Sequence, residues 1–163
     1  MEKVPEFQIG SLLRASGMKL VTAESCTGGL VAHRITNVSG SSEYFLGGVV
    51  AYDNRVKMEI LKVPVELLAQ FGAVSEETVL AMAAGVRQLF GADIAVSVSG
   101  IAGPLGGSEE KPVGTTWIGL SAPDVNLARM FIWPGDRLEN KEASAGAALQ
   151  LVLDYLNGNP LNG

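Results

Sequence analysis

The chain is short of the residues that many catalytic and metal centres use. Its 163 residues include one cysteine and one histidine, and 18% are charged, against about 25% in an average domain. With Cys26 alone no internal disulfide can form, which is typical of proteins in a reducing cytoplasm. One cysteine and one histidine do not make the ligand set of a zinc site, and the scattered acidic residues lack the spacing of a calcium loop. We therefore expect no metal site.

The sequence also lacks long apolar runs and basic clusters. No run approaches the roughly 18 apolar residues that span a bilayer, and residues 1–7 have no apolar core of a secretory signal. The net charge is −5 without a Lys/Arg cluster, whereas nucleic-acid binders carry a basic stripe. We expect a cytoplasmic protein without a membrane or nucleic-acid partner. Because so few charges cover its surface, we expect a homo-oligomer that buries apolar surface.

Hydrophobic residues are plentiful instead, at 47% of the chain, and 20 glycines cluster in a few segments. This hydrophobic content excludes a disordered chain, and the length suits a single domain. We expect one domain over residues 1–157 and a flexible tail over residues 158–163.

Periodicity and capping residues predict an alternation of helices and strands. Predicted helices cover residues 5–16, 27–35, 55–61, 64–71, 75–90 and 137–156, and predicted strands cover residues 19–23, 45–52, 93–99, 115–121 and 127–133. The last two strands have a short connection, which favours an antiparallel hairpin. The order predicts a single α/β domain of three layers, α/β/α, around a mixed sheet.

Two glycine-containing loops follow predicted strands. In the first loop, residues 22–29, the side chains of Ser25, Cys26 and Thr27 are possible nucleophiles or donors. The N–H groups at the start of the helix that follows could bind an anion or oxyanion. The simpler interpretation is that Ser25 and Thr27 only cap that helix. The second loop, residues 99–114, is not a dinucleotide fingerprint because no helix follows it. It is either a long turn or, as long glycine-rich loops more often are, functional.

The single histidine narrows the choice of base. His33 follows Cys26 by seven residues, roughly 10 Å along a helix, so it cannot reach Ser25 in the same subunit, although a neighbouring subunit could bring it there. Lys57, near a predicted helix start, is a candidate because burial and the positive helix end would lower its pKa, and Tyr52 could orient the proton. On residue chemistry alone, a solvated Lys57 and a half-buried strand tyrosine are the simpler interpretation.

Five motifs in order resemble one family. They are T-A-E-S-C-T-G-G at 22–29, G-G-V-V-A-Y-D-N-x-x-K at 47–57, G-A-V-S-E-E at 72–77, S-G-I-A-G-P at 99–104 and K-P-V-G-T at 111–115. Together they are similar to the CinA C-terminal domain family, whose stand-alone form is nicotinamide-nucleotide amidohydrolase (NMN deamidase). The resemblance runs from about Pro5 to Leu156.

This resemblance implies hydrolysis of the carboxamide of nicotinamide mononucleotide (NMN) to nicotinate mononucleotide and ammonia, in pyridine-nucleotide salvage, without metal or organic cofactor. It makes Ser25 the nucleophile and Tyr52 and Lys57 the proton-handling partners. Residues expected to bind the substrate are Thr27, Gly28 and Gly29 as the oxyanion or phosphate site, with Ser99, Gly100, Gly103, Lys111 and Arg137.

The sequence departs from the family pattern at three places. Ser99 stands where threonine is usual and keeps the hydroxyl, Leu105 replaces a small or polar residue, and Lys141 is the nearest cation where a second arginine often follows Arg137. The last departure leaves an alternative open, a non-catalytic nucleotide-binding or interaction module. A DNA-associated role is a poorer option because the chain is acidic.

Overall fold

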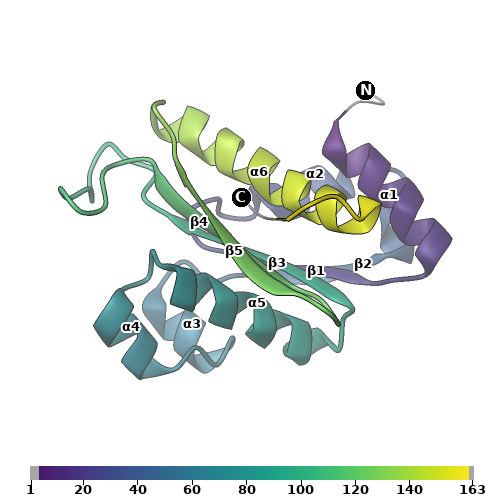
Figure 1. Cartoon of the computed structure of the whole chain (residues 1–163), viewed down its shortest axis with the longest axis horizontal. Coiled ribbons are helices and arrows are strands. Elements are labelled where there is room, and N and C mark those ends of the chain that lie inside the picture. The colour runs from purple at the N-terminus through teal and green to yellow at the C-terminus, as the bar shows by residue number, and fades with distance from the viewer. Residues whose placement is uncertain (1–3, 162–163) are drawn as a thin grey trace.

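The computed structural model describes residues 4–161 and forms a five-stranded sheet between two helical layers (Figure 1). The strands are β1 (Leu20–Glu24), β2 (Phe45–Val50), β3 (Ile94–Gly100), β4 (Thr115–Ser121) and β5 (Asn126–Ile132). The helices are α1 (Pro5–Ser16), α2 (Leu30–Thr36), α3 (Asn54–Glu59), α4 (Val65–Phe71), α5 (Glu76–Phe90) and α6 (Arg137–Asn157), with a 3-10 turn at Ser41–Glu43.

The sheet has the order β2-β1-β3-β4-β5. β1 is parallel to β2 and β3, while β4 is antiparallel to β3 and β5. Helices α1, α2 and α6 cover one face and α3, α4 and α5 the other (Figure 1). The predicted three-layer α/β/α fold, its mixed sheet and its closing antiparallel hairpin are therefore confirmed.

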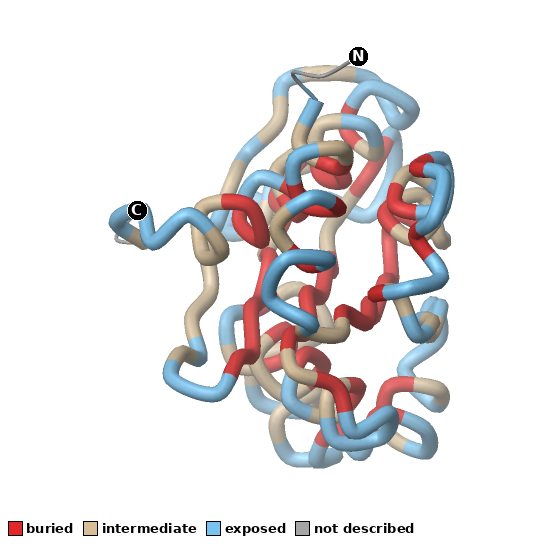
Figure 2. Tube along the Cα trace, turned by 90° about the vertical axis from the view of Figure 1, so that its right-hand side faces the viewer, coloured by how far each residue is buried: buried red, intermediate tan, exposed pale blue. Residues whose placement is uncertain are grey.

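Both faces of the central strands are buried. Buried segments run along the middle of the molecule in Figure 2, and every residue of β3 except its last is buried. Such a strand needs apolar or small side chains along its whole length, because a helical layer lies on either side. One core joins the sheet to α1, α2 and α6, and the other joins it to α5.

Most predicted bounds lie within two residues of the observed ones. Two of the differences bear on the site. The strand predicted over residues 45–52 ends at Val50, because the chain then turns into α3, where the Asp53 side chain accepts a hydrogen bond from Arg55 N at 2.8 Å. The helix predicted from Thr27 begins only at Leu30, because Gly28 and Gly29 have φ angles of +60° and +104°. Residues 25–29, the serine turn hereafter, are therefore not helical.

Two expectations concern the domain bounds and the membrane. The division into a domain over 1–157 and a tail over 158–163 stays a prediction, and residues 1–3, 162 and 163 of it lie outside the described part. Within residues 4–161, none of the helices combines the length and apolarity needed to cross a bilayer.

Candidate active site

Ser25 follows the carboxyl end of β1, the middle one of three parallel strands. Its N–H donates to Val98 O of β3 at 2.9 Å, and its carbonyl accepts from Gly28 N at 3.1 Å. The residue is 8% exposed. Carboxyl ends of parallel strands are where open α/β sheets bind ligands, so the fold places this serine at a favourable edge.

Lys57 approaches Ser25 from α3, on a different segment. Its Nζ lies 3.1 Å from Ser25 Oγ and donates to Ala51 O at 2.7 Å and to Tyr52 O at 3.2 Å. The residue is 1% exposed. The structure thus brings together the serine and the lysine that the sequence singled out, and it excludes the interpretation of Lys57 as a solvated helix lysine.

The surroundings of Lys57 favour its neutral form. Burial lowers the pKa of its amine, an effect that the nearby Asp53 and Cys26 partly oppose. A neutral amine has two N–H donors and one lone pair, which matches two carbonyls and one hydroxyl. In that form, Lys57 can accept the proton of Ser25.

The main-chain donors near Ser25 differ in whether they are already bonded. The first free N–H groups of α2, on Val31 and Ala32, donate to the Glu24 carboxylate at 2.8 and 3.1 Å. The helix start is therefore occupied by the chain's own carboxylate and is not an open anion site. Within residues 4–161, the N–H groups of Thr27 and Gly29 have no hydrogen-bond partner, so they are the available donors next to Ser25.

Cys26 points into the core. Its side chain packs against β3, since a Cβ on Gly100 would lie 3.1 Å from Cys26 Sγ. Burial is the main cause that raises the pKa of the thiol to about 11. Because the thiolate is the reactive form, Cys26 is poorly suited to compete with Ser25 as nucleophile.

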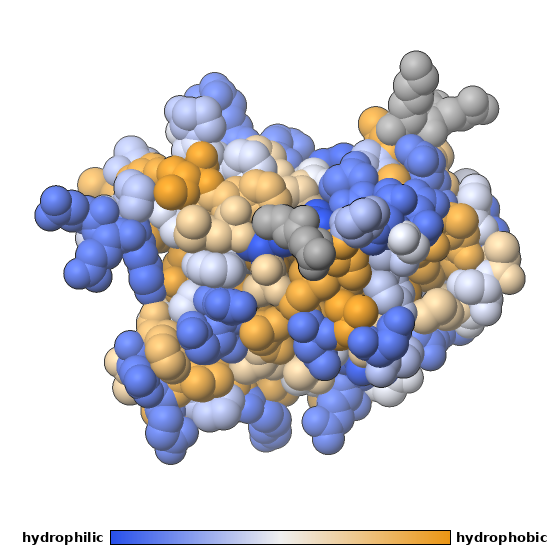
Figure 3. Space-filling model, in the orientation of Figure 1, coloured by the Kyte–Doolittle hydropathy of each residue, from blue (hydrophilic) through white to orange (hydrophobic). Residues whose placement is uncertain are grey.

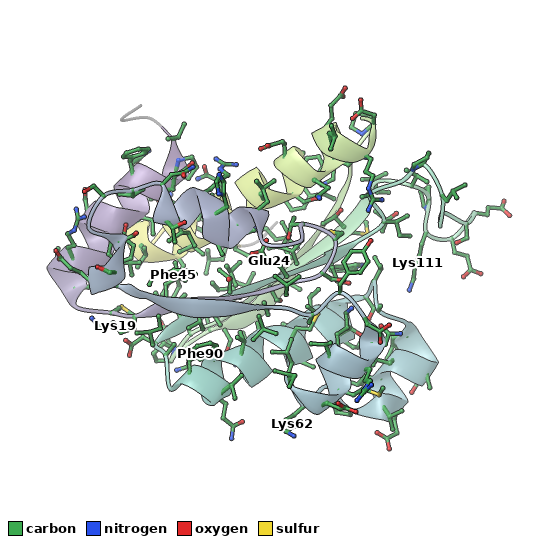
Figure 4. The ribbon with its side chains drawn as sticks, turned by 180° about the vertical axis from the view of Figure 1, so that it is seen from behind. Lys19, Glu24, Phe45, Lys62, Phe90 and Lys111 are labelled. Carbon is green, nitrogen blue, oxygen red and sulfur yellow. The ribbon has the colours of Figure 1, made fainter. Side chains whose placement is uncertain are left out.

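Ser99 and Lys111 are bonded elsewhere. The Ser99 hydroxyl donates to Ala73 O at 2.7 Å, and Lys111 Nζ donates to Phe71 O at 2.7 Å. Figure 4 shows Lys111 on the loop that projects from one end of the sheet, whereas Glu24 lies below α2. The two polar groups hold the end of α4 and the segment that follows it, and neither is bonded to Ser25 or Lys57.

Tyr52 and Arg137 form a bridge between loops. Arg137 donates to the Tyr52 hydroxyl at 3.2 Å and to Gly103 O at 2.8 Å. Tyr52 is 61% exposed, and only its main-chain carbonyl contacts Lys57. The buried Asn140 adds a second tie, which the sequence did not indicate, by bonding Gly135 N and Ala102 O at 3.0 Å each.

Two cavities of about 450 Å³ each lie at the start of α6, and the first of them is also lined by residues of the serine turn. The first is lined by Thr27, Gly28, Gly29, Leu30, His33, Leu138, Lys141 and Glu142. The second is lined by Ala102, Gly103, Pro104, Val113, Gly135, Asp136, Arg137 and Leu138. Their volume suits a small ligand, for which sites measure about 300–1,000 Å³, and each has a cationic side chain in its wall.

Across the described residues, no group of three or more His, Cys, Asp or Glu side chains could hold a metal ion.

Comparison with known proteins gives a consistent result. The model of the CinA C-terminal domain matches residues 2–156. CinA-like proteins of Chloroherpeton thalassium and Cytophaga hutchinsonii are 51% and 50% identical over 93% and 90% of the chain. The matched parts are 37% and 35% of those two proteins, so the chain spans well under half the length of these curated relatives.

Solved structures share the fold. A CinA superfamily protein from Klebsiella pneumoniae is 32% identical with a TM-score of 0.90, covering 94% of this chain and 96% of that one. A competence/damage inducible protein from Agrobacterium tumefaciens is 41% identical with a TM-score of 0.84, covering 92% and 96%. By sequence and by fold, this chain belongs to the CinA C-terminal domain family.

Proposed function

We propose that this domain is an amidohydrolase that converts NMN to nicotinate mononucleotide and ammonia, in pyridine-nucleotide salvage. The observation that carries the proposal is the 3.1 Å contact between Ser25 Oγ and a buried Lys57 Nζ whose other partners are two carbonyls. Such a pair supplies a nucleophile and its base without a histidine. The choice of NMN rests on the family resemblance described above.

The reaction proceeds in two steps. Neutral Lys57 takes the proton from Ser25 Oγ, which bonds to the carboxamide carbon. The tetrahedral intermediate collapses as Lys57 returns the proton to the leaving nitrogen, so ammonia departs and an ester on Ser25 remains. Water then attacks the ester, Lys57 takes its proton and returns it to Ser25 Oγ, and nicotinate mononucleotide is released. The free N–H groups of Thr27 and Gly29 are the candidate oxyanion donors, worth about 3–4 kcal/mol each in comparable sites.

The substrate phosphate needs a cation. Lys141 and His33 line one cavity and Arg137 lines the other. Lys141 Nζ is close to the serine turn, 3.8 Å from the position a Cβ would take on Gly28. Lys141 is therefore our candidate for the cation that binds the phosphate, in place of the second arginine that often follows Arg137 in the family.

The test is ammonia release from NMN by Ser25→Ala and Lys57→Met, with Lys62→Met as the control for Lys57. Both site variants should lose activity while circular dichroism shows an unchanged fold, because each removes one half of the proton transfer. The control should stay active, since Lys62 is exposed. Full activity in either site variant refutes its assigned role.

Two outcomes would favour other functions. Tight NMN binding by calorimetry without any nicotinate mononucleotide on long incubation favours the non-catalytic binding module. Binding of duplex DNA at physiological salt would contradict the expectation, from a net charge of −5, that the chain has no nucleic-acid partner.

A further inference from the structure

Glu24 is a buried carboxylate that the reaction above does not use. It is the last residue of β1, is 1% exposed, and takes part in none of the ion pairs within residues 4–161. Its Oε1 accepts from Thr27 Oγ1 at 2.6 Å and from Val31 N at 2.8 Å, and its Oε2 accepts from Ala32 N at 3.1 Å. Because an uncompensated buried charge is costly, these three donors hold the serine turn and α2 against Glu24.

The main chain of Glu24 is linked to Lys57 through Ala51. Its carbonyl accepts from Ala51 N at 2.7 Å, and Ala51 O accepts from Lys57 Nζ at 2.7 Å. One residue is therefore bonded through its side chain to the turn that carries Ser25, and through its main chain to the residue that orients Lys57.

We propose that Glu24 is a positioning residue, whose carboxylate fixes the serine turn so that Ser25 Oγ stays within hydrogen-bond reach of Lys57 Nζ. The inference rests on the proposed roles of Ser25 and Lys57, but not on the identity of the substrate. All three partners of the carboxylate are donors, and a carboxylate has acceptor sites for all of them. A glutamine has the same shape, yet it turns an NH₂ group toward at least one of those donors and leaves it unpaired.

The test measures the reactivity of Ser25 directly. An aryl sulfonyl fluoride forms a sulfonate ester on an activated serine with loss of fluoride, and mass spectrometry follows the labelling rate of Ser25. In the Glu24→Gln variant, Ser25 should be labelled about 10- to 100-fold more slowly than in wild type. A displacement of a reacting group by about 1 Å can lower a reaction rate by up to about 100-fold. With NMN, kcat should fall by a similar factor while KM stays near the wild-type value.

Glu6→Gln is the matched control. Glu6 is also a buried carboxylate, 7% exposed, and it also holds α2, through Arg34 at 3.0 Å on both oxygens. Urea unfolding should show that both variants lose stability, whereas only Glu24→Gln loses Ser25 reactivity. Equal labelling rates in the two variants, or a wild-type rate in Glu24→Gln, overturn the proposal.

A second pair of variants applies if Glu24→Gln does not fold. Thr27→Val removes the hydroxyl that donates to Glu24, and Thr27→Ser keeps it. Labelling should slow in Thr27→Val and recover in Thr27→Ser, and failure of the serine variant to recover counts against the proposal.

Failure of the proposed function can be distinguished from failure of the positioning role of Glu24. If wild-type Ser25 labels rapidly but NMN releases no ammonia, the substrate assignment is wrong and the positioning role stands. If wild-type Ser25 does not label, no reactive serine is being positioned and the inference fails.

Discussion

At the scale of single residues, the partner and the surroundings of each side chain decide which groups can react. Ser25 and Cys26 are neighbours in sequence, but the Ser25 hydroxyl lies 3.1 Å from the Lys57 amine. The Cys26 thiol lies in the core instead, where burial raises its pKa to about 11. Lys57 has a lowered pKa because of burial. The same physical effect therefore suppresses the thiolate and favours the neutral amine.

The lowered pKa of Lys57 makes stability depend on pH. The folded protein loses this proton at a lower pH than the unfolded chain, in which lysine titrates near 10.4. In the interval between these two pKa values the unfolded state binds more protons, so the free energy of unfolding should rise with pH. Urea titrations at a series of pH values should show this rise in wild type and not in Lys57→Met. An equal slope in both proteins would contradict the assignment, and Lys62→Met should behave like wild type.

Cys26 should react slowly with alkylating reagents. Iodoacetamide at neutral pH should modify the native protein far more slowly than the protein unfolded in guanidinium, because the thiol is 7% exposed and its pKa is about 11. Mass spectrometry gives both rates. Rapid native alkylation that abolishes ammonia release, and a Cys26→Ala variant without activity, would instead make Cys26 the nucleophile.

At the scale of elements, close backbone approaches fix how the layers pack. α5 lies against the segment that follows α3, since a Cβ on Gly85 would come within 1.9 Å of Leu61 O. By contrast, a Cβ on Gly146 of α6 would meet only the end of the Arg34 side chain, at 3.4 Å. Packing therefore requires a glycine at position 85, whereas it leaves room for a methyl group at position 146.

Substitution of these two glycines by alanine should change stability in opposite directions. Gly85→Ala should destabilise by about 1–3 kcal/mol, because the backbone must move to admit the methyl group. Gly146→Ala should stabilise by about 0.5–1 kcal/mol, because alanine loses less conformational freedom in a helix. Chemical denaturation measures both, and a neutral Gly85→Ala would show that α5 can shift without cost.

At the scale of the whole molecule, the parallel half of the sheet carries the candidate site and the antiparallel half completes the core. β1 lies between β2 and β3, so the loops after all three strands meet near Ser25. Apolar side chains remain on the surface, as Figure 3 shows for one face, and they include Leu105 and Leu138 at 85% and 71% exposed.

The expected homo-oligomer is a prediction at this scale. Sedimentation velocity should give a mass that is a multiple of 17.0 kDa, because exposed apolar side chains and a charged fraction of 18% favour burial between copies. A species of 17.0 kDa at every concentration tested would contradict it.

The sequence by itself determined the order of the elements, the mixed sheet, the family and the two residues of the Ser25–Lys57 pair as candidates. These follow from local signals that act over a few residues, such as strand periodicity, short motifs and helix caps. The Ser75 side chain, for example, accepts a hydrogen bond from Thr78 N at the start of α5. The start of α2 was predicted too early, because glycines at positive φ in the serine turn end the helical pattern.

Only the tertiary structure decided between a solvated and a buried Lys57, directed Cys26 inward, joined Tyr52 to Arg137 and placed Glu24 against the serine turn. The contacts of Lys57 with Ser25 and of Arg137 with Tyr52 join segments 30 or more residues apart, so they depend on how whole layers pack. The side-chain contacts of Glu24 are local, but they depend on the path of the serine turn, in which two glycines adopt positive φ.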